Sequence, residues 1–404
     1  MTRYLLIQAT GAARAGQLAT LEETLTSLGM RWQDVQQHVM AGRTTLMLLL
    51  ENSDEVLSAP QLQRRVAPAL EQAGLEGTVE AISEAQWRAL VSDASRQIMT
   101  VMGPRLTPEA IAQSERMAHH HGLTTVSVER RSGRRTFEQA DGMGECVEFV
   151  LQGAADMDVL RQEALTLGQA FGVDIVFQPA DQWRHRRRLI CFDMDSTLIK
   201  TEVINELAER HGVHDRVADI TERAMRGELD FRESFTQRMA MLEGLDQSVL
   251  EEIAAQLPLM DGAEHLFAEL KRLGYRTAIL SGGFTCFAKT LQQRLGIDDV
   301  YANVLDINAE GKVTGKVVEP IVDAQCKADT LRALAEQQGI TLEQTVAVGD
   351  GANDLKMLGV AGLGVAWHAK PKVKAQARQA VSTLGLDALL YLLGHDAQTL
   401  SASA

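Results

Sequence analysis

From residue 189 onward, short apolar strands alternate with longer helical segments, and this alternation limits the possible folds more than any other feature of the chain. The predicted strands are Leu189–Phe192, Arg276–Leu280, Thr345–Val348 and Gly364–Ala366. Strands that are apolar throughout and separated by helices are typical of a parallel sheet with both faces covered. We therefore expect an α/β fold with a doubly wound parallel sheet in this half.

The segment 200–262 interrupts this alternation. It is helical and polar, and it contains no apolar stretch that suits a core strand. It follows the first predicted strand directly, so it is inserted between that strand and the rest of the sheet. We expect a small helical cap at about 200–262, placed above the strand ends.

The first predicted strand, Leu189–Phe192, ends in the sequence DMDST, which places Asp193 and Asp195 two positions apart. In parallel α/β sheets, ligands bind beyond the carboxyl ends of the strands. Two carboxylates so close together are costly unless a cation lies between them. Because Mg²⁺ prefers hard oxygen ligands, the motif predicts a magnesium site, with a capped turn as the alternative interpretation.

The second predicted strand, Arg276–Leu280, runs into Ser281, Gly282 and Gly283. A hydroxyl group and exposed backbone N–H groups at a strand end form a cradle for phosphate. Glycine suits such a turn because a β-carbon would block the close approach of a ligand to the backbone. These three residues are therefore candidates for contact with a phosphoryl group.

The third predicted strand, Thr345–Val348, runs into the turn GDGAND. Asp350 in this turn is a candidate metal ligand, while Asn353 and Asp354 can hold a metal-bound water or position a cation. Lys327 opens a predicted helix, and its ammonium group can neutralise a nucleophile and phosphoryl oxygens. Three polar turns at the strand ends of one sheet predict one shared active site.

Taken together, DMDST, LSGG, Lys327 and GDGAND resemble the haloacid dehalogenase superfamily of phosphohydrolases, and the similarity is strongest to its phosphoserine phosphatases. The resemblance covers about 189–393. It implies a Rossmann-like sheet with a helical cap between the first two motifs, as expected for 200–262. It also implies phosphoserine as the substrate, Mg²⁺ as the cofactor, and an aspartyl-phosphate intermediate, in the last step of serine biosynthesis.

The resemblance also implies a role for each motif residue. Asp193 would be the nucleophile, and Asp195 would protonate the leaving group and then activate water. Asp193, the backbone carbonyl of Asp195, and Asp350 would bind Mg²⁺, with Asp354 behind them orienting the metal-bound water or Lys327. The residues that would contact the phosphoryl group are Ser281, Gly282, Gly283, Lys327 and Asn353.

Within the cap, the resemblance implies contacts to the amino-acid part of the substrate. Glu202 would bind the ammonium group and Arg238 the carboxylate. Met225 and Phe231 match apolar positions that close over the site. Two other functions stay open: a phosphotransferase that passes the phosphoryl group to another alcohol such as homoserine, and a non-enzymatic amino-acid sensor.

Residues 1–90 and 91–183 show the same predicted order of strand, helix, strand, strand, helix, strand, which indicates an internal duplication of a ferredoxin-like α+β unit. By topology both copies resemble ACT domains, which often bind amino acids and pair with each other. Many amino-acid-binding members carry an acidic residue after the first strand. The corresponding turns, Gly11–Gly16 and Gly103–Pro108, lack it. The resemblance therefore implies that the two domains serve mainly to pair two chains into a homodimer. Regulation by serine is their alternative role.

Composition restricts the partners. A formal net charge of −14 argues against nucleic acid as the main partner. The basic run Trp183–Arg188 is short, and we interpret it as a solvated linker before a domain at 184–404.

No apolar run approaches the roughly 18 residues of a membrane helix. The four cysteines are widely spaced, which suggests neither disulfides nor zinc. We expect a cytoplasmic protein that binds neither nucleic acid nor membranes.

Overall fold

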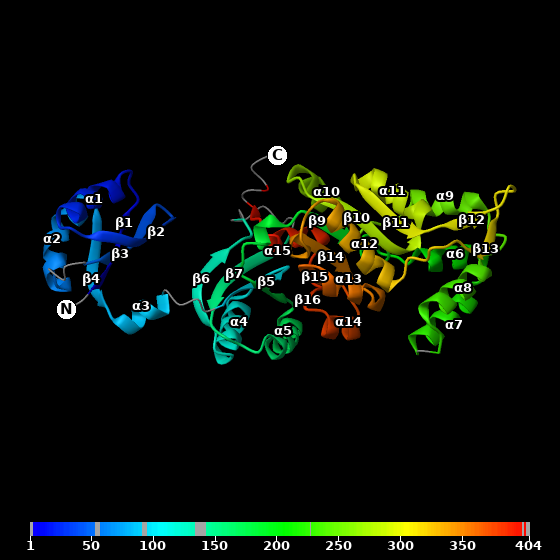
Figure 1. Cartoon of the computed structure of the whole chain (residues 1–404), viewed down its shortest axis with the longest axis horizontal. Helices are drawn as coiled ribbons and strands as arrows, with labels where there is room; N and C mark the ends of the chain where they lie inside the picture. The colour runs from blue at the N-terminus through cyan, green and yellow to red at the C-terminus, as the bar shows by residue number, and fades with distance from the viewer. Residues whose placement is uncertain are drawn as a thin grey trace. The chain divides into compact units, whose positions relative to one another are not determined.

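The computed structural model describes residues 3–52, 57–90, 95–133, 143–226, 228–397 and 400 of the 404-residue chain. The chain divides into two compact units, Met1–Asp93 and Ala94–Ala404 (Figure 1). Within the described residues, no helix combines the length and the apolar character that a membrane span requires.

The first unit is an antiparallel sheet with helices against one face. Its elements are β1 (Tyr4–Ala12), α1 (Gln17–Ser27), β2 (Arg31–Met40), β3 (Arg43–Glu51), α2 (Ala59–Gln72), β4 (Leu75–Ile82) and α3 (Glu84–Leu90). The strand order is β2-β3-β1-β4. Leu5, Ile7 and Ala9 of β1 are buried in one core with α1 and α2, because alternate side chains of a strand point to the same face. The βαββαβ order predicted for this repeat is confirmed, and α3 is an additional helix.

The second repeat has the same topology and lies within the second unit. Its elements are β5 (Arg96–Gly103), α4 (Pro108–His120), β6 (Thr124–Arg130), β7 (Glu145–Gln152), α5 (Met157–Phe171) and β8 (Asp174–Pro179). The strand order is β6-β7-β5-β8. One face of this sheet packs on α4 and α5. Met102, Cys146 and Val176 on the other face share a core with Leu389 and Leu393 near the C-terminus, so the repeat packs directly on the α/β half.

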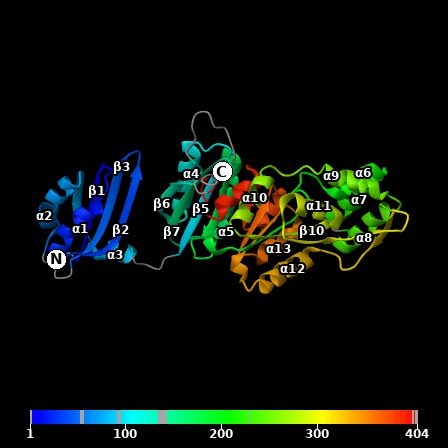
Figure 2. The ribbon, with the colours of Figure 1, turned by 90° about the horizontal axis from the view of Figure 1, so that it is seen from above.

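A six-stranded parallel sheet forms the centre of the α/β half (Figure 2). Its strands are β9 (Leu189–Phe192), β10 (Arg276–Phe284), β11 (Asp299–Asn303), β14 (Thr345–Gly349), β15 (Leu363–Trp367) and β16 (Gln379–Val381), in the order β11-β10-β9-β14-β15-β16. Its helices are α10 (Ala263–Arg272), α11 (Thr285–Leu295), α12 (Ala324–Gln337), α13 (Leu355–Val360), α14 (Pro371–Gln376) and α15 (Leu389–Leu392). Short 3₁₀ helices occur at Arg184–Arg186, Leu342–Gln344, Ala352–Asp354 and Leu386–Ala388.

Helices cover both faces of this sheet. Ile190 and Phe192 of β9 belong to the core that contains α10 and α11, whereas Leu189 and Cys191 belong to the core that contains α12 and α13. The doubly wound parallel sheet is therefore confirmed. The sequence did not reveal β11 and β16, because β11 is largely polar and β16 has three residues.

The insertion after β9 is a helical cap, as predicted, and Figure 1 shows it beyond one end of the sheet. Its helices are α6 (Val203–His211), α7 (His214–Met225), α8 (Phe231–Met241) and α9 (Gln247–Ala255). A hairpin, β12 (Leu305–Ile307) and β13 (Val313–Val317), joins them from later in the chain. Two backbone hydrogen bonds, from Gly244 N to Val313 O at 2.8 Å and from Val313 N to Leu245 O at 2.9 Å, fasten the hairpin to the cap. The sequence analysis did not predict this second segment.

The basic run Trp183–Arg188 is not a solvated linker, which corrects that prediction. Arg184 and Arg187 are only 2% and 4% exposed. The Arg184 guanidinium forms an ion pair with Glu148 of β7 and donates a hydrogen bond to the carbonyl of Tyr391 at 3.1 Å. A buried arginine is tolerated when a carboxylate and carbonyl groups satisfy it. Because Glu148 lies 36 positions earlier in the chain, the local sequence gave no sign of this pairing.

Candidate active site

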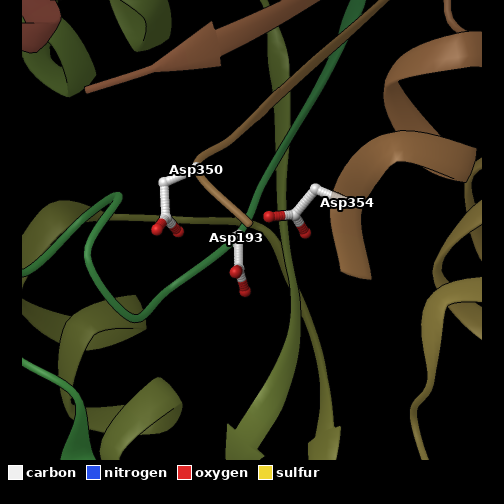
Figure 3. Close-up of side chains that lie close together, drawn as sticks. All are labelled: Asp193, Asp350 and Asp354. Carbon is white, nitrogen blue, oxygen red and sulfur yellow. The ribbon is translucent and has the colours of Figure 1, made fainter. Parts of the chain in front are cut away.

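The acidic turns after β9 and β14 meet at one edge of the sheet. The two strands are parallel neighbours, with Phe192 opposite Val348, so Asp193 and the turn that carries Asp350 and Asp354 emerge side by side. Figure 3 shows the three carboxylates gathered where these turns meet. One ligand oxygen from each lies within 4.8 Å of the others. The predicted convergence of the first and third motifs is observed.

Lys327, in the first turn of α12, joins two of these carboxylates. Its Nζ lies 2.8 Å from Asp193 Oδ1 and 2.7 Å from Asp354 Oδ1, and the side chain is completely buried. Burial alone would lower the pKa of Lys327, but the charges and hydrogen bonds of the two aspartates outweigh it and raise that pKa. The lysine is therefore a fixed ammonium group beside Asp193.

The two oxygens of Asp193 have different surroundings. Oδ1 accepts hydrogen bonds from Lys327 Nζ and, at 2.8 Å, from the backbone N–H of Met194. Within the described part of the chain, no group donates a hydrogen bond to Oδ2. The carboxylate is thus held by one oxygen, while the other is available to a ligand.

The acidic cluster has more negative charge than Lys327 can neutralise. Burial and the charges of Asp193 and Asp354 raise the pKa of Asp350 to about 8. Burial and the charge of Asp193 raise the pKa of Asp354 to about 7, although Lys327 opposes this shift. Among the described residues, Asp350 has no cationic partner, and its near neighbour Thr197 donates only a long hydrogen bond of 3.4 Å. This set of hard oxygen atoms with excess charge fits a small divalent cation.

Asp195 occupies a crowded position beside the glycine turn of β10. Its Oδ1 accepts a hydrogen bond from the N–H of Val203 at 2.8 Å. A β-carbon added to Gly283 would lie 2.6 Å from Asp195 Oδ2, so only glycine fits there. Burial, followed by the charges of Glu202 and Asp193, raises the pKa of Asp195 well above its ordinary value. These surroundings favour a carboxyl group that can carry a proton.

The turn Ser281–Gly283 lies inside β10 rather than after it, unlike the predicted strand end at Leu280. The pairing register with β11 shifts between Ser281 and Phe284, so the turn is an irregularity after which the strand resumes. The N–H of Gly283 donates to Ser281 Oγ at 2.9 Å. A β-carbon on Gly282 would meet Phe231 Cζ at 3.5 Å and the carbonyl oxygen of Val322 at 3.6 Å, which are ordinary van der Waals contacts.

Three of the four cap residues predicted to contact a substrate can be placed. Glu202 is exposed and accepts a hydrogen bond from Ser196 Oγ at 3.0 Å. Arg238 is half-buried; burial lowers its pKa, and the neighbouring charges of Glu202 and Asp195 oppose that shift. The ring of Phe231 lies against Gly282, with Cζ 3.5 Å from the position of an added β-carbon.

Two predicted residues are less fully described. Met225 is the last residue of α7, and its side chain lies outside the described residues. Asn353 is half-buried in the 3₁₀ turn after β14, where its Oδ1 lies against Gly351. Among the described residues, no hydrogen bond or ion pair joins the Asn353 side chain to Lys327, Asp193 or Asp350.

Ser196 lies within DMDST but had no predicted role. Ser196 adopts a left-handed backbone conformation with φ of 54°, which is uncommon for a residue other than glycine. Its N–H donates to the carbonyl of Thr201 at 3.2 Å while its hydroxyl holds Glu202. The motif itself contains this serine, but its partner Glu202 could be identified only from the folded structure.

Comparison with known proteins places this architecture among characterised families. Residues 187–362 match haloacid dehalogenase-like hydrolases, and residues 3–79 match the ACT domain. The chain is 40% identical over 391 residues to a phosphoserine phosphatase of Streptomyces coelicolor, covering 96% of this chain and 92% of that protein. It is 37% identical over 406 residues to a phosphoserine phosphatase of Mycobacterium tuberculosis, covering 96% and 93%. A solved structure of a probable phosphoserine phosphatase from Vibrio cholerae is 36% identical with a TM-score of 0.58, covering 77% of this chain and 90% of that one.

Proposed function

The chain belongs to the phosphoserine phosphatase family of haloacid dehalogenase-like hydrolases, and we propose that it hydrolyses O-phospho-L-serine to L-serine and phosphate. The observation that carries this proposal is the buried Lys327, which holds Asp193 by one oxygen beside a second acidic turn. A carboxylate fixed in this way is suited to attack a phosphorus atom. Glu202 and Arg238 of the cap supply the opposite charges that an amino acid requires.

In the first step, Asp193 Oδ2 attacks phosphorus and the bond to the serine oxygen breaks, which forms an aspartyl-phosphate. Asp195 donates its proton to the departing serine alkoxide. The raised pKa of Asp195 supports this role, since the group must be protonated beforehand. Asp195 then takes a proton from water, and the resulting attack on phosphorus releases phosphate and restores Asp193.

The proposed metal ligands are Asp193, the backbone carbonyl of Asp195, and Asp350. Asp354 is assigned to a supporting role because both its oxygens already have partners, Lys327 Nζ at 2.7 Å and Gly351 N–H at 2.9 Å. A divalent cation, for which we propose Mg²⁺, would neutralise phosphoryl charge when bound. Asp354 keeps Lys327 in place beside Asp193.

Phosphoryl transfer depends on positioning and charge neutralisation. We assign the phosphoryl oxygens to Lys327 and to the turn that contains Ser281, Gly282 and Gly283. The place of the turn supports this assignment, because Gly283 lies directly beside Asp195, whose Oδ2 would be 2.6 Å from an added β-carbon. Asn353 is proposed to contact the phosphate or an ordered water.

The cap is proposed to select the substrate. Glu202 would bind the ammonium group and Arg238 the carboxylate, while Phe231 and Met225 would close over the bound molecule. The Ser196 hydroxyl, 3.0 Å from Glu202, would keep that carboxylate oriented. Opposite charges at two points match an amino acid better than a sugar phosphate or an aryl phosphate.

Arg238→Ala is expected to raise KM for phosphoserine by about 10- to 100-fold, because a charge-assisted hydrogen bond to the substrate carboxylate contributes about 1.5–3 kcal/mol. KM for para-nitrophenyl phosphate, which has no carboxylate, should change little. Steady-state kinetics on both substrates measure the difference. Equal effects on the two would exclude Arg238 from carboxylate recognition. Arg232→Ala, on the same helix but in an exposed pair with Glu319, is the matched control.

The proposed activity is tested by measuring phosphate release from L-phosphoserine with and without Mg²⁺, beside phosphothreonine and a sugar phosphate. We expect release that depends on Mg²⁺ and is fastest with phosphoserine, and loss of activity after chelation that added Mg²⁺ restores. A faster reaction with another ester would keep the chemistry but reject the substrate. Transfer of phosphate to an added alcohol would favour a phosphotransferase, and no turnover at all would favour a sensor.

We also propose that the N-terminal repeats pair two chains into a homodimer. β2 and β6 are edge strands of their sheets and carry exposed apolar side chains, among them Val39 at 58% and Val128 at 48%. Exposed apolar edge strands are common sites of association. Regulation by serine at these repeats and a cytoplasmic location stay predictions.

A further inference from the structure

Asn303, the last residue of β11, connects two loops of the proposed active site through its side chain. It is 1% exposed. Its Nδ2 donates a hydrogen bond to the carbonyl of Gly282 at 2.8 Å, and its Oδ1 accepts one from the N–H of Val322, also at 2.8 Å. Gly282 lies in the turn assigned to the phosphoryl group, and Val322 lies in the loop that leads into the helix of Lys327.

The backbone of Asn303 is itself anchored. Its Cα pairs in register with Phe284, the residue that follows the glycine turn. The Thr285 hydroxyl, at the start of α11, lies 2.9 Å from the carbonyl of Asn303 and 3.0 Å from that of Ala302. A rigid, planar amide on a fixed backbone sets the separation of the two groups that it bridges.

The bridge also determines how the glycine turn is oriented. The peptide between Gly282 and Gly283 has both polar groups occupied, the carbonyl by Asn303 Nδ2 and the N–H by Ser281 Oγ. The turn therefore cannot rotate about this peptide without breaking a buried hydrogen bond. On the other side, the N–H of Lys327 donates to Asp323 O, so the start of α12 moves together with the loop that Asn303 holds.

We infer that Asn303 is a positioning residue for phosphoryl transfer, which holds the Ser281–Gly283 turn and the start of the Lys327 helix at the separation that one phosphoryl group requires. As a positioning residue it would act without touching the substrate, and within the described residues no hydrogen bond joins its side chain to Asp193. The inference rests on the proposed phosphoryl site but not on which alcohol is esterified. Loss of the bridge therefore affects every phosphate ester alike, in contrast to loss of Arg238.

Asn303→Asp is the sharpest test, because it keeps the shape and the acceptor for Val322 but replaces the donor to Gly282. Asn303→Ser, which shortens the side chain and breaks both links, serves as a second variant. The matched control is Thr277→Val, which removes a buried hydroxyl at the opposite end of β10, where it donates to Asp298 Oδ2 at 3.2 Å, and leaves every bond of Asn303 in place. Circular dichroism and thermal unfolding establish that each variant is folded.

For both Asn303 variants, kcat/KM should fall about 100-fold on phosphoserine and on para-nitrophenyl phosphate, since a small misplacement of catalytic groups has effects of this size. The ratio between the two substrates should stay unchanged. Binding of inorganic phosphate, measured by calorimetry in the presence of Mg²⁺, should weaken in parallel. Thr277→Val should keep near wild-type kinetics even if its unfolding temperature falls as much as that of the Asn303 variants.

Several results would overturn the inference. One is a folded Asn303→Asp or Asn303→Ser enzyme with wild-type kcat/KM and phosphate affinity. Another is an equal loss in Thr277→Val, which would indicate a merely structural role. If the wild-type chain hydrolyses the aryl ester but not phosphoserine, the proposed substrate fails while the Asn303 comparison still stands. If the wild-type chain hydrolyses neither ester, the inference is decided by the affinity for inorganic phosphate alone: equal affinity in the wild-type chain and the Asn303 variants would overturn it.

Discussion

Asp193→Asn is expected to lower kcat on phosphoserine by at least about 10⁴-fold, because loss of an essential nucleophile removes the covalent step. The amide has nearly the volume of the carboxylate, and its oxygen can still accept hydrogen bonds from Lys327 and Met194. The fold should therefore be retained. Phosphate release under saturating substrate measures the loss, with circular dichroism as the check on folding.

Asp329→Asn is the matched control for this experiment. Asp329 lies on the same helix as Lys327, but it is exposed and pairs with Arg332 at 2.7 Å. The same chemical change there should leave kcat near the wild-type value. If Asp193→Asn kept more than about a tenth of wild-type activity, Asp193 would not be the nucleophile, since such losses normally span several orders of magnitude.

Glu148→Ala is expected to destabilise the second unit by about 3–5 kcal/mol, because it leaves a buried arginine without its carboxylate. Glu148 and Arg184 are each 2% exposed, and Arg131 Nη2 lies 2.7 Å from Glu148 on the other side. Without Glu148, the buried Arg184 guanidinium would lose its carboxylate, whereas Arg131, which is 23% exposed, would keep Glu129 at 3.3 Å. The interface between the second repeat and the α/β half should lose its structure first.

Hydrogen exchange of the full chain measures this effect locally. Peptides from β7, β8 and β16 should lose protection, while peptides from β1 to β4 in the first unit serve as an internal reference. Glu264→Ala, which removes an exposed partner of Arg294, should cost no more than about 1 kcal/mol. Unchanged protection in Glu148→Ala would show that the buried pair contributes little to the interface.

The same pair has a predicted pH dependence. Burial would raise the pKa of Glu148, but hydrogen bonds and charges from Arg184 and Arg131 outweigh it and hold that pKa below the ordinary value of 4.5. A carboxyl group whose pKa is lower in the folded chain than in the unfolded chain stabilises the fold at pH values above its ordinary pKa. This contribution is lost as the pH falls below 4.5 through the folded-state pKa, because the unfolded chain then binds the proton more readily.

Much of the α/β half could be predicted because its signals are local. The strand Leu189–Phe192 is apolar at every position, which identifies a strand buried on both faces, and the structure has the same bounds. In the second repeat, the start of α4 (Pro108–His120) also has local causes, because Thr107 caps the helix and proline occupies its first position. Since parallel strands end at a common edge, the meeting of the turns that carry Asp193 and Asp350 could also be expected.

Tertiary structure alone decided the features that depend on partners distant in the chain. Arg184 appeared solvated because its neighbours in sequence are basic, and only the folded chain brings Glu148 against it. Asn303 appeared as an ordinary polar residue because the groups it bridges, Gly282 and Val322, lie 21 and 19 positions away. Sequence patterns therefore determined the central strands and the cap, because these depend on nearby residues, and the motifs at the strand ends with their family resemblance supplied the candidate catalytic residues. Charge pairing, burial and the spacing of the active-site loops were decided by the fold, because those energies depend on distances between residues that the chain itself does not connect.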